Sequence, residues 1–212
     1  NSAQSIHLMT EVMKQAYADR AHYLGDSDFV RVPLKALSSK DYAKKIQKQI
    51  NLRKATPSTA LSHAPALPYE SHETTHFSVA DSFGNAVSNT YTLNFSYGSH
   101  IVVEGAGFLL NNEMDDFSAK PGVANAYGLI GGKANQIEAE KRMLSSMSPT
   151  ILKKNGKNFL ITGTPGGSRI ITTTLQIILN VIDHQLNIQS AVNAPRIHHQ
   201  CLPDELRIEE GL

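Results

Sequence analysis

The sequence predicts an α+β layered sandwich, because the expected elements come in three blocks: helices, then antiparallel hairpins, then helices again. Apolar residues recur at three- and four-residue spacing before residue 55, which is typical of amphipathic helices. Residues 75–93 and 148–162 instead form pairs of strand-like runs around Gly-containing turns. The run Ile170–Ile182 that follows is long and apolar enough for a buried helix.

The first helix is expected over residues 6–24, with Gly25 as a natural stop. A second helix is expected to begin after Ser38 or Ser39, whose hydroxyl can cap it, and to run to Ile50. Hairpins are predicted for 76–80 with 86–93 and for 148–154 with 157–162, the latter around the strong turn signal Asn155-Gly156. The other expected elements are short: strands at 101–103, 107–110 and 205–208, and a helix at Ile188–Asn193.

Residues 55–73 carry three prolines and no periodicity, so we expect a solvent-exposed linker of the kind that proteases cut. The linker ends at Thr74, where the first strand begins. A threonine that starts a chain can use its own α-amino group as base, because free α-amines titrate at about 7.7 to 8.0. Propensity alone favours the simpler interpretation that Thr74 and Thr75 open a strand.

The totals exclude several classes of protein. A formal charge of +1 over 212 residues gives no footprint for nucleic acid or an acidic membrane surface. No apolar run reaches the roughly 18 to 20 residues needed to span a bilayer. The lone Cys201 excludes an internal disulfide framework and a cysteine-based zinc site. His76, His198 and His199 lack a matching acidic spacing, so we expect no metal site.

Both ends of the sequence look cut, so we expect a fragment of a longer precursor. The first residues contain no methionine start and no signal peptide, and they lie inside a predicted helix.

Several blocks of sequence occur in a fixed order: TTHFSV (74–79), TYTLN (90–94), LNNEMDDF (110–117), SSMSPT (145–150), GTPGGSR (163–169) and NAPRIHHQ (193–200). Together they resemble the small subunit of γ-glutamyltranspeptidases, bacterial ones in particular. Residues 16–26 resemble the end of that family's large subunit. The resemblance implies that 1–73 is the C-terminal part of a large subunit ending in a flexible linker. It implies that 74–212 is the small catalytic subunit, truncated at its C-terminus.

The same resemblance implies the fold and the reacting groups. The fold would be part of an αββα four-layer sandwich of the N-terminal-nucleophile hydrolase type. The bond between Glu73 and Thr74 would be the cleavage site, and Thr74 the nucleophile, with the Thr92 hydroxyl beside it. Gly166 and Gly167 would offer backbone N–H groups to an oxyanion. Without the family, the glycine pair is weak evidence and fits many loops.

Substrate recognition also follows from the resemblance. Asn94, Glu113 and Asp116 would bind the α-amino group of a γ-glutamyl substrate, because an ammonium group needs oxygen acceptors. Ser145 and Ser146 would donate hydrogen bonds to its α-carboxylate. Taken alone, the acidic residues fit a solvated turn and the two serines fit a plain turn.

A lid would cover the site. It would span 116–132, with Tyr127 near its tip, and its Gly and Ala content suits a mobile loop. A plain surface loop is the alternative.

The implied activity is that of an autoprocessing γ-glutamyltransferase and glutathione hydrolase that needs no cofactor. Its partners would be glutathione and other γ-glutamyl compounds, amino acid or dipeptide acceptors, and the remainder of the large subunit in a heterodimer. That remainder would supply an arginine for the substrate carboxylate. The location would be periplasmic or secreted. Two alternatives stay open: a sister enzyme, such as a cephalosporin acylase or a poly-γ-glutamate depolymerase, and a non-catalytic interaction module.

Overall fold

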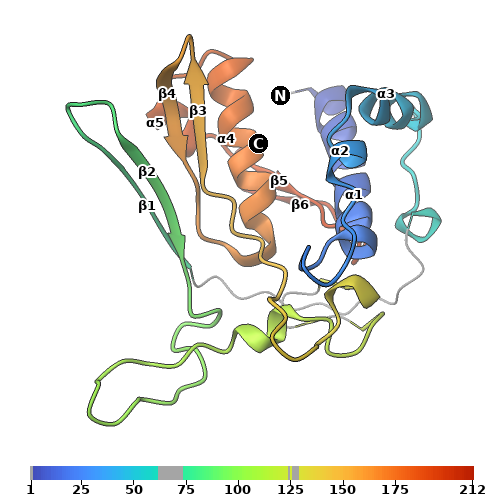
Figure 1. The fold of residues 1–212 in the computed structure, drawn as a ribbon. Coiled ribbons are helices and arrows are strands. Elements are labelled where there is room, and N and C mark those ends of the chain that lie inside the picture. The colour runs from blue at the N-terminus through green and yellow to red at the C-terminus, as the bar shows by residue number, and fades with distance from the viewer. Residues whose placement is uncertain (1, 62–73, 124, 126–128) are drawn as a thin grey trace. The chain divides into compact units, whose positions relative to one another are not determined.

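The computed structural model describes residues 2–61, 74–123, 125 and 129–212 (Figure 1). Its chain divides into two compact units. Unit 1 consists of Asn1–Tyr69, Met114–Leu144 and Ile197–Leu212. Unit 2 consists of Glu70–Glu113 and Ser145–Arg196. Both units mix helices with antiparallel strands. Unit 1 therefore draws its segments from both sides of Thr74.

Unit 1 is built around one long helix. Its elements are α1 (Ala3–Tyr23), α2 (Leu34–Leu37), α3 (Lys40–Gln49), η1 (Ser58–Ala60), η3 (Lys133–Asn135), β5 (Ile197–His198) and β6 (Arg207–Ile208). Helix α1 buries Met13 and Tyr17, and the Tyr17 ring meets the edge of His198 on β5, with ring centroids 5.9 Å apart. β5 pairs antiparallel with β6. The predicted first helix and last strand are therefore confirmed.

Helix α3 begins where its cap predicts. The Tyr42 N–H donates to the Ser39 hydroxyl at 3.1 Å, which satisfies one of the unpaired N–H groups of the first turn. The four-residue helix α2 was not predicted, because one helical turn after Pro33 is too short to show a period.

Of the predicted solvent-exposed linker the structure describes residues 55–61, which are exposed at Ala55, Pro57, Thr59 and Ala60 but not at Ser58. Ser58 is 0% exposed and lies in the short turn η1, whereas residues 62–73 lie outside the described residues. The backbone N–H of Thr56 donates to Glu11, and that of Ser58 donates to Asp204. Carboxylates from distant segments thus satisfy this backbone, and local composition gives no sign of them.

Unit 2 contains two hairpins and two helices. Its elements are β1 (Thr75–Ala80), β2 (Ala86–Tyr91), β3 (Thr150–Lys154), β4 (Lys157–Thr162), η4 (Gly167–Arg169), α4 (Ile170–Ile182) and α5 (Ile188–Asn193). Both predicted hairpins are confirmed, and both helices have their predicted bounds. Asn155 and Gly156, with φ of 52° and 78°, make the tight turn between β3 and β4.

Side chains connect the two hairpins. The Ser88 hydroxyl on β2 donates to the Thr162 carbonyl at 2.9 Å and accepts from the Thr150 N–H at 3.1 Å. His76 on β1 lies against Gly163, where an added Cβ would come within 2.3 Å of the imidazole ring. Glycine at 163 therefore lets β1 approach the end of β4.

The strands predicted at 101–103 and 107–110 are wrong. Only the single bridge between Val102 and Leu109 forms there. Gly105 and Gly107 take φ of 76° and 73°, and the Gly107 N–H donates to the Val103 carbonyl, so the backbone turns instead of extending. Among the described residues, no helix is both long and apolar enough to cross a bilayer.

A buried histidine gives unit 1 a predicted acid sensitivity. The Cys201 N–H donates to His199 Nδ1, so Nε2 carries the ring hydrogen and faces Asp204 Oδ1 at 3.2 Å. Burial and the nearby Lys14 ammonium lower the pKa of His199 from 6.5 to about 4, against the raising effect of Asp204; His198 also lowers it. The unfolded chain therefore takes up a proton between pH 6.5 and 4 that the folded chain does not.

Stability is expected to fall as the pH drops through that window. The loss is at most about 1.4 kcal/mol per pH unit for one proton and about 3 kcal/mol in total. Thermal denaturation of the full-length protein at several pH values would measure it. His199→Gln keeps a donor toward Asp204 without titrating, so its melting temperature should change less from pH 6.5 to 4. Equal pH slopes in the two proteins would contradict the assignment to His199.

Candidate active site

Thr74 and Thr92 meet at the open end of the first hairpin. In the register of β1 and β2, Thr75 lies opposite Tyr91, so the next residues outward, Thr74 and Thr92, come to face each other. The Thr74 hydroxyl donates to the Thr92 hydroxyl at 3.4 Å, and both side chains are half-buried. The strand pairing thus places Thr74, the predicted nucleophile, next to the Thr92 hydroxyl that was predicted to assist it.

A turn after β2 holds the Thr92 oxygen from its other side. The Asn94 N–H donates to Thr92 Oγ1 at 2.9 Å. Asn94 has φ of 73°, a left-handed conformation that asparagine tolerates better than most residues, and it is only 2% exposed. The Thr92 oxygen therefore accepts one hydrogen bond from Thr74 and one from the backbone of Asn94.

Asn112 fastens this turn to the far end of the loop that follows it. Asn94 Nδ2 donates to the Asn112 carbonyl at 3.2 Å, and the Phe95 N–H donates to Asn112 Oδ1 at 3.0 Å. The Asn112 N–H in turn donates to the Leu93 carbonyl at 3.1 Å. Asn112 was not among the predicted site residues. Its place beside Glu113 in the LNNEMDDF block was the only signal that pointed toward it.

Glu113 follows Asn112 directly in the chain. It is buried, and its N–H donates to Asn111 Oδ1 at 2.9 Å as the chain enters the turn η2 (Glu113–Asp116). Asp116, three residues on, belongs to unit 1, where its carbonyl accepts from Asn135 Nδ2 at 2.7 Å. The described contacts thus gather Thr74, Thr92 and Asn94 in unit 2, with Glu113 joined to them through the chain.

The two predicted carboxylate-binding serines lie in a turn just before β3. Ser145 is exposed and its hydroxyl accepts from the Met147 N–H at 3.1 Å. Ser146 is half-buried, and its carbonyl accepts from the Ser148 hydroxyl at 2.9 Å. Both serines belong to unit 2, as Thr74 does.

Gly166 and Gly167 form the entry to helix α4. Gly166 has φ of 130° and Gly167 of 56°, and the Arg169 N–H closes a turn onto the Gly166 carbonyl at 3.0 Å. Through η4 the chain then runs straight into α4. Backbone N–H groups at the start of a helix favour a negative charge. The location therefore suits the predicted oxyanion role.

Two predicted residues, Glu73 and Tyr127, lie outside the described residues. Two described residues of the predicted lid form hydrogen bonds with other residues of unit 1. The Ser118 N–H donates to the Asn135 carbonyl at 2.8 Å, and Asn125 Nδ2 donates to the Asp115 carbonyl at 3.3 Å. The roles of Glu73 and Tyr127 stay predictions.

The three histidines have ordinary partners. His76 Nδ1 lies 2.8 Å from the Thr90 hydroxyl, and burial lowers its pKa. His198 Nε2 pairs with Gln200 at 2.9 Å, and His199 faces Asp204. Within the described part of the chain, no group of three His, Cys, Asp or Glu side chains is placed to hold a metal ion.

Comparison with known proteins extends over the whole chain. The sequence profile of the family described as Gamma-glutamyltranspeptidase matches residues 1–212. The glutathione hydrolase proenzyme of Escherichia coli (strain K12) is 60% identical over 210 residues, which are 99% of this chain and 36% of that protein. This chain therefore spans about a third of the length of the curated relatives that it matches.

Solved structures agree with the sequence comparison. A mutant of the Helicobacter pylori γ-glutamyltranspeptidase is 71% identical, with a TM-score of 0.62 over 63% of this chain and 72% of that chain. A cephalosporin acylase from Bacillus halodurans is 26% identical, with a TM-score of 0.71 over 94% of this chain and 33% of that chain. The profile match over all 212 residues decides the assignment: this chain belongs to the γ-glutamyltranspeptidase family.

Proposed function

We propose that this chain carries the self-cleaving, catalytic portion of a γ-glutamyltransferase and glutathione hydrolase with Thr74 as its nucleophile. The observation that carries the proposal is the hydroxyl pair at the end of the first hairpin, Thr74 and Thr92 at 3.4 Å. The Asn94 N–H bond to Thr92 fixes one side of that pair. The E. coli relative is named a proenzyme, which is in keeping with activation by cleavage.

The first reaction cuts the chain before Thr74. The Thr74 oxygen attacks the carbonyl carbon of Glu73, and the peptide nitrogen leaves as the α-amine of Thr74. An ester then joins the Glu73 carbonyl to the Thr74 oxygen. Water hydrolyses this ester, which leaves a carboxylate on Glu73 and a free hydroxyl and amine on Thr74. Residues 1–73 and 74–212 are thereby assigned to a large and a small subunit.

The second reaction uses the new N-terminus. The Thr74 α-amine takes the hydroxyl proton as the oxygen attacks the γ-glutamyl amide carbonyl. The backbone N–H groups of Gly166 and Gly167 stabilise the tetrahedral oxyanion. The proton then passes to the leaving amine, and the γ-glutamyl group remains as an ester on Thr74. Water, or the amine of an amino acid or dipeptide, takes that group and restores the enzyme.

Five side chains are proposed to recognise the substrate. Asn94, Glu113 and Asp116 accept hydrogen bonds from its α-ammonium group, and Ser145 and Ser146 donate to its α-carboxylate. For Asn94 the support is its place next to the hydroxyl pair, where its N–H donates to Thr92 Oγ1 at 2.9 Å, together with the family resemblance. For Asp116 the support is its position three residues after Glu113 and the family resemblance.

The wider assembly belongs to the same proposal. The complete protein would form the four-layer αββα sandwich of N-terminal-nucleophile hydrolases, as a heterodimer whose large subunit contains the rest of the precursor. The likeness to the H. pylori and B. halodurans structures supports that fold. Tyr127 would stand on a lid over the site. We place the protein in the periplasm or outside the cell, as suits a bacterial glutathione hydrolase.

A cephalosporin acylase is the second candidate. The B. halodurans acylase covers 94% of this chain at a TM-score of 0.71, so the scaffold alone does not separate the two activities. The buried Glu113 carboxylate favours a substrate with a free ammonium group. Parallel assays of glutathione and a glutaryl cephalosporin on the same preparation would decide. Faster hydrolysis of the cephalosporin would overturn the γ-glutamyl assignment.

Mass spectrometry of the full-length protein tests the proposal directly. After incubation at neutral pH, intact mass and N-terminal sequencing should reveal a chain that begins Thr74-Thr75-His76. The same sample should release cysteinylglycine from glutathione. A well-folded protein that stays uncut, or is cut elsewhere, would contradict the assignment of Thr74. A correctly cut protein without glutathione turnover would contradict only the substrate.

Asn112 is predicted to position the ammonium-binding turn. Asn112→Ala removes the side-chain oxygen that accepts from the half-buried Phe95 N–H, a loss of about 1–3 kcal/mol in comparable cases. Because the Asn94 turn would loosen, we expect KM for glutathione to rise about tenfold, with a smaller change in kcat. Asn158→Ala, which removes the side-chain bond to the Gly84 carbonyl, is the matched control and should leave KM unchanged. An unchanged KM in Asn112→Ala would refute the positioning role.

A further inference from the structure

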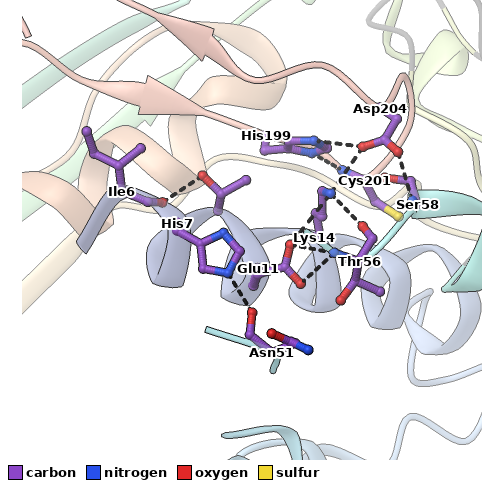
Figure 2. A network of polar contacts seen from close by, with 11 residues as sticks. Ile6, His7, Glu11, Lys14, Asn51, Thr56, Ser58, His199, Cys201 and Asp204 are labelled. Carbon is purple, nitrogen blue, oxygen red and sulfur yellow. Dashed lines mark hydrogen bonds and ion pairs between the residues drawn. The ribbon is translucent and has the colours of Figure 1, made fainter. Parts of the chain in front are cut away.

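A network of polar groups joins helix α1 to two other segments of unit 1 (Figure 2). Lys14 stands at its centre, with a side chain that is 5% exposed. Its Nζ donates to the Thr56 carbonyl at 2.7 Å and lies 3.2 Å from Asp204 Oδ1 and 3.7 Å from Glu11 Oε1. One ammonium group therefore contacts three segments: α1, the stretch around residue 56, and the stretch around residue 204.

Asp204 makes the second set of contacts. Its Oδ2 accepts from the Ser58 N–H at 2.9 Å, and its Oδ1 faces His199 Nε2 at 3.2 Å. Burial raises the pKa of Asp204, but the Ser58 hydrogen bonds and the Lys14 ammonium outweigh it and lower that pKa to about 2. Asp204 is thus ionised at neutral pH, although its side chain is 43% exposed and solvent partly screens its charge.

Glu11 completes the network from the α1 side. Both of its carboxylate oxygens accept from the Thr56 N–H, at 3.1 and 3.3 Å. The backbone of Thr56 is therefore satisfied twice, at its N–H by Glu11 and at its carbonyl by Lys14. Two residues of the first helix therefore hold the backbone of one residue, Thr56, in the segment that leads toward Thr74.

The members of this network come from opposite sides of the cleavage point. Glu11, Lys14, Thr56 and Ser58 precede Thr74, whereas His199 and Asp204 follow it. A second ion pair in unit 1 also joins a residue that precedes Thr74 to a residue that follows it. Arg142 Nη2 donates to Asp26 Oδ1 at 2.6 Å, and the Asp26 carboxylate is 2% exposed.

We propose that the Lys14 network is a joint between the two chains that cleavage at Thr74 produces. Its partner surface on the small subunit is the segment 199–204, with the Asp204 carboxylate as the recognised group. On the large subunit it anchors residues 56–58, which lie within the last described stretch before the cut, a stretch that ends at Leu61. This inference rests on the proposed cleavage before Thr74.

Cleavage before Thr74 changes what holds the segments on its two sides together. In the uncut precursor, the peptide bond at Thr74 keeps Lys14 and Asp204 in one molecule, so their effective concentration is high without any contact between them. After the cut, only non-covalent contacts hold the two chains together. If the network only stabilises the core, its loss should destabilise the uncut and the cleaved protein equally. If it joins the two chains, its loss should destabilise the cleaved protein more.

The experiment compares Lys14→Met in two backgrounds of the full-length protein: the cleavable chain and the uncut Thr74→Ala precursor. Methionine keeps much of the aliphatic volume but removes the charge, which leaves Glu11 and the Thr56 carbonyl without their buried donor. In the cleaved protein we expect the urea midpoint for chain separation, followed by size-exclusion chromatography, to fall by on the order of 1 M. In the precursor, the unfolding midpoint should fall clearly less.

Two further variants keep the comparison decisive. Tyr42→Phe removes a hydrogen bond to Asp19 that lies wholly before Thr74, so it should act equally in both backgrounds. Asp204→Asn replaces Lys14→Met if that variant does not fold, because it neutralises the partner yet keeps an acceptor for Ser58. If the cleavable chain is cut but Lys14→Met lowers the urea midpoint equally in both backgrounds, only the proposed joint between the chains is overturned. Protein that mass spectrometry finds uncut would overturn the proposed function and the joint together.

Discussion

Thr74→Ala is expected to abolish both the cleavage before residue 74 and the turnover of glutathione. The substitution removes the hydroxyl and the γ-methyl from a half-buried position just outside the paired residues of β1 and β2, so we expect the strand register to persist. Without that oxygen no ester can form with Glu73, and no γ-glutamyl ester can form afterwards. Loss of a covalent nucleophile typically costs on the order of 10⁶ in kcat. Intact mass and a cysteinylglycine release assay on the full-length protein measure both losses.

Two neighbouring variants separate chemistry from structure. Thr74→Ser keeps the attacking oxygen, so it should still cleave and turn over, more slowly because the γ-methyl no longer fixes the rotamer. Thr75→Ala alters the next residue, which is exposed and opens β1, and should behave nearly as the parent protein does. Normal cleavage in Thr74→Ala would remove Thr74 from the mechanism. Loss of cleavage in Thr75→Ala would show that strand structure, and not the Thr74 hydroxyl, controls the cut.

The sequence predicted those parts of the fold whose cause is local. The Ser39 cap sets the start of α3, and Asn155-Gly156 sets the turn between β3 and β4. In each case a short segment contains both the signal and the group that it satisfies. The bounds of Ile170–Ile182 also agree, because a long apolar run before a polar turn is itself the signal.

The errors arise where the cause is distant in sequence. Ser58 looked like part of an exposed linker, yet its N–H is bound by Asp204, 146 residues later. Gly105 and Gly107 turned a predicted strand pair into a loop with one bridge. Periodicity cannot reveal a partner outside the window in which it is measured.

The candidate site divides in the same way. The pairing of Thr74 with Thr92 follows from the hairpin register, which the sequence predicts from the strands and their turn. The support that Asn112 gives to Asn94 depends on how the intervening loop closes, and no local signal specifies that closure. Asp116 shares a short motif with Glu113 but falls in the other unit, so motif membership alone did not define which compact unit contains it.

Gly166→Ala is expected to lower kcat by on the order of 10²–10³, the usual cost of losing an oxyanion donor. The reason is conformational and not steric. An added Cβ would meet only Arg169 Cβ, at 3.8 Å, but φ of 130° is a backbone state that L side chains rarely adopt. Alanine would therefore rotate the Gly166–Gly167 peptide and turn its N–H away from the entry to α4. Rates for glutathione, divided by the cleaved fraction from intact mass, measure the effect.

Gly156→Ala is the matched control, because it introduces a similar backbone strain away from the proposed oxyanion site. Gly156 has φ of 78° in the turn between β3 and β4, and an added Cβ there meets nothing within 4 Å. Both substitutions should cost about 1–3 kcal/mol of stability, because both force alanine into a left-handed backbone. Only Gly166→Ala should also lose kcat. If the two variants lose kcat equally, the loss comes from general strain; if Gly166→Ala folds and keeps its kcat, these glycines do not hold the oxyanion.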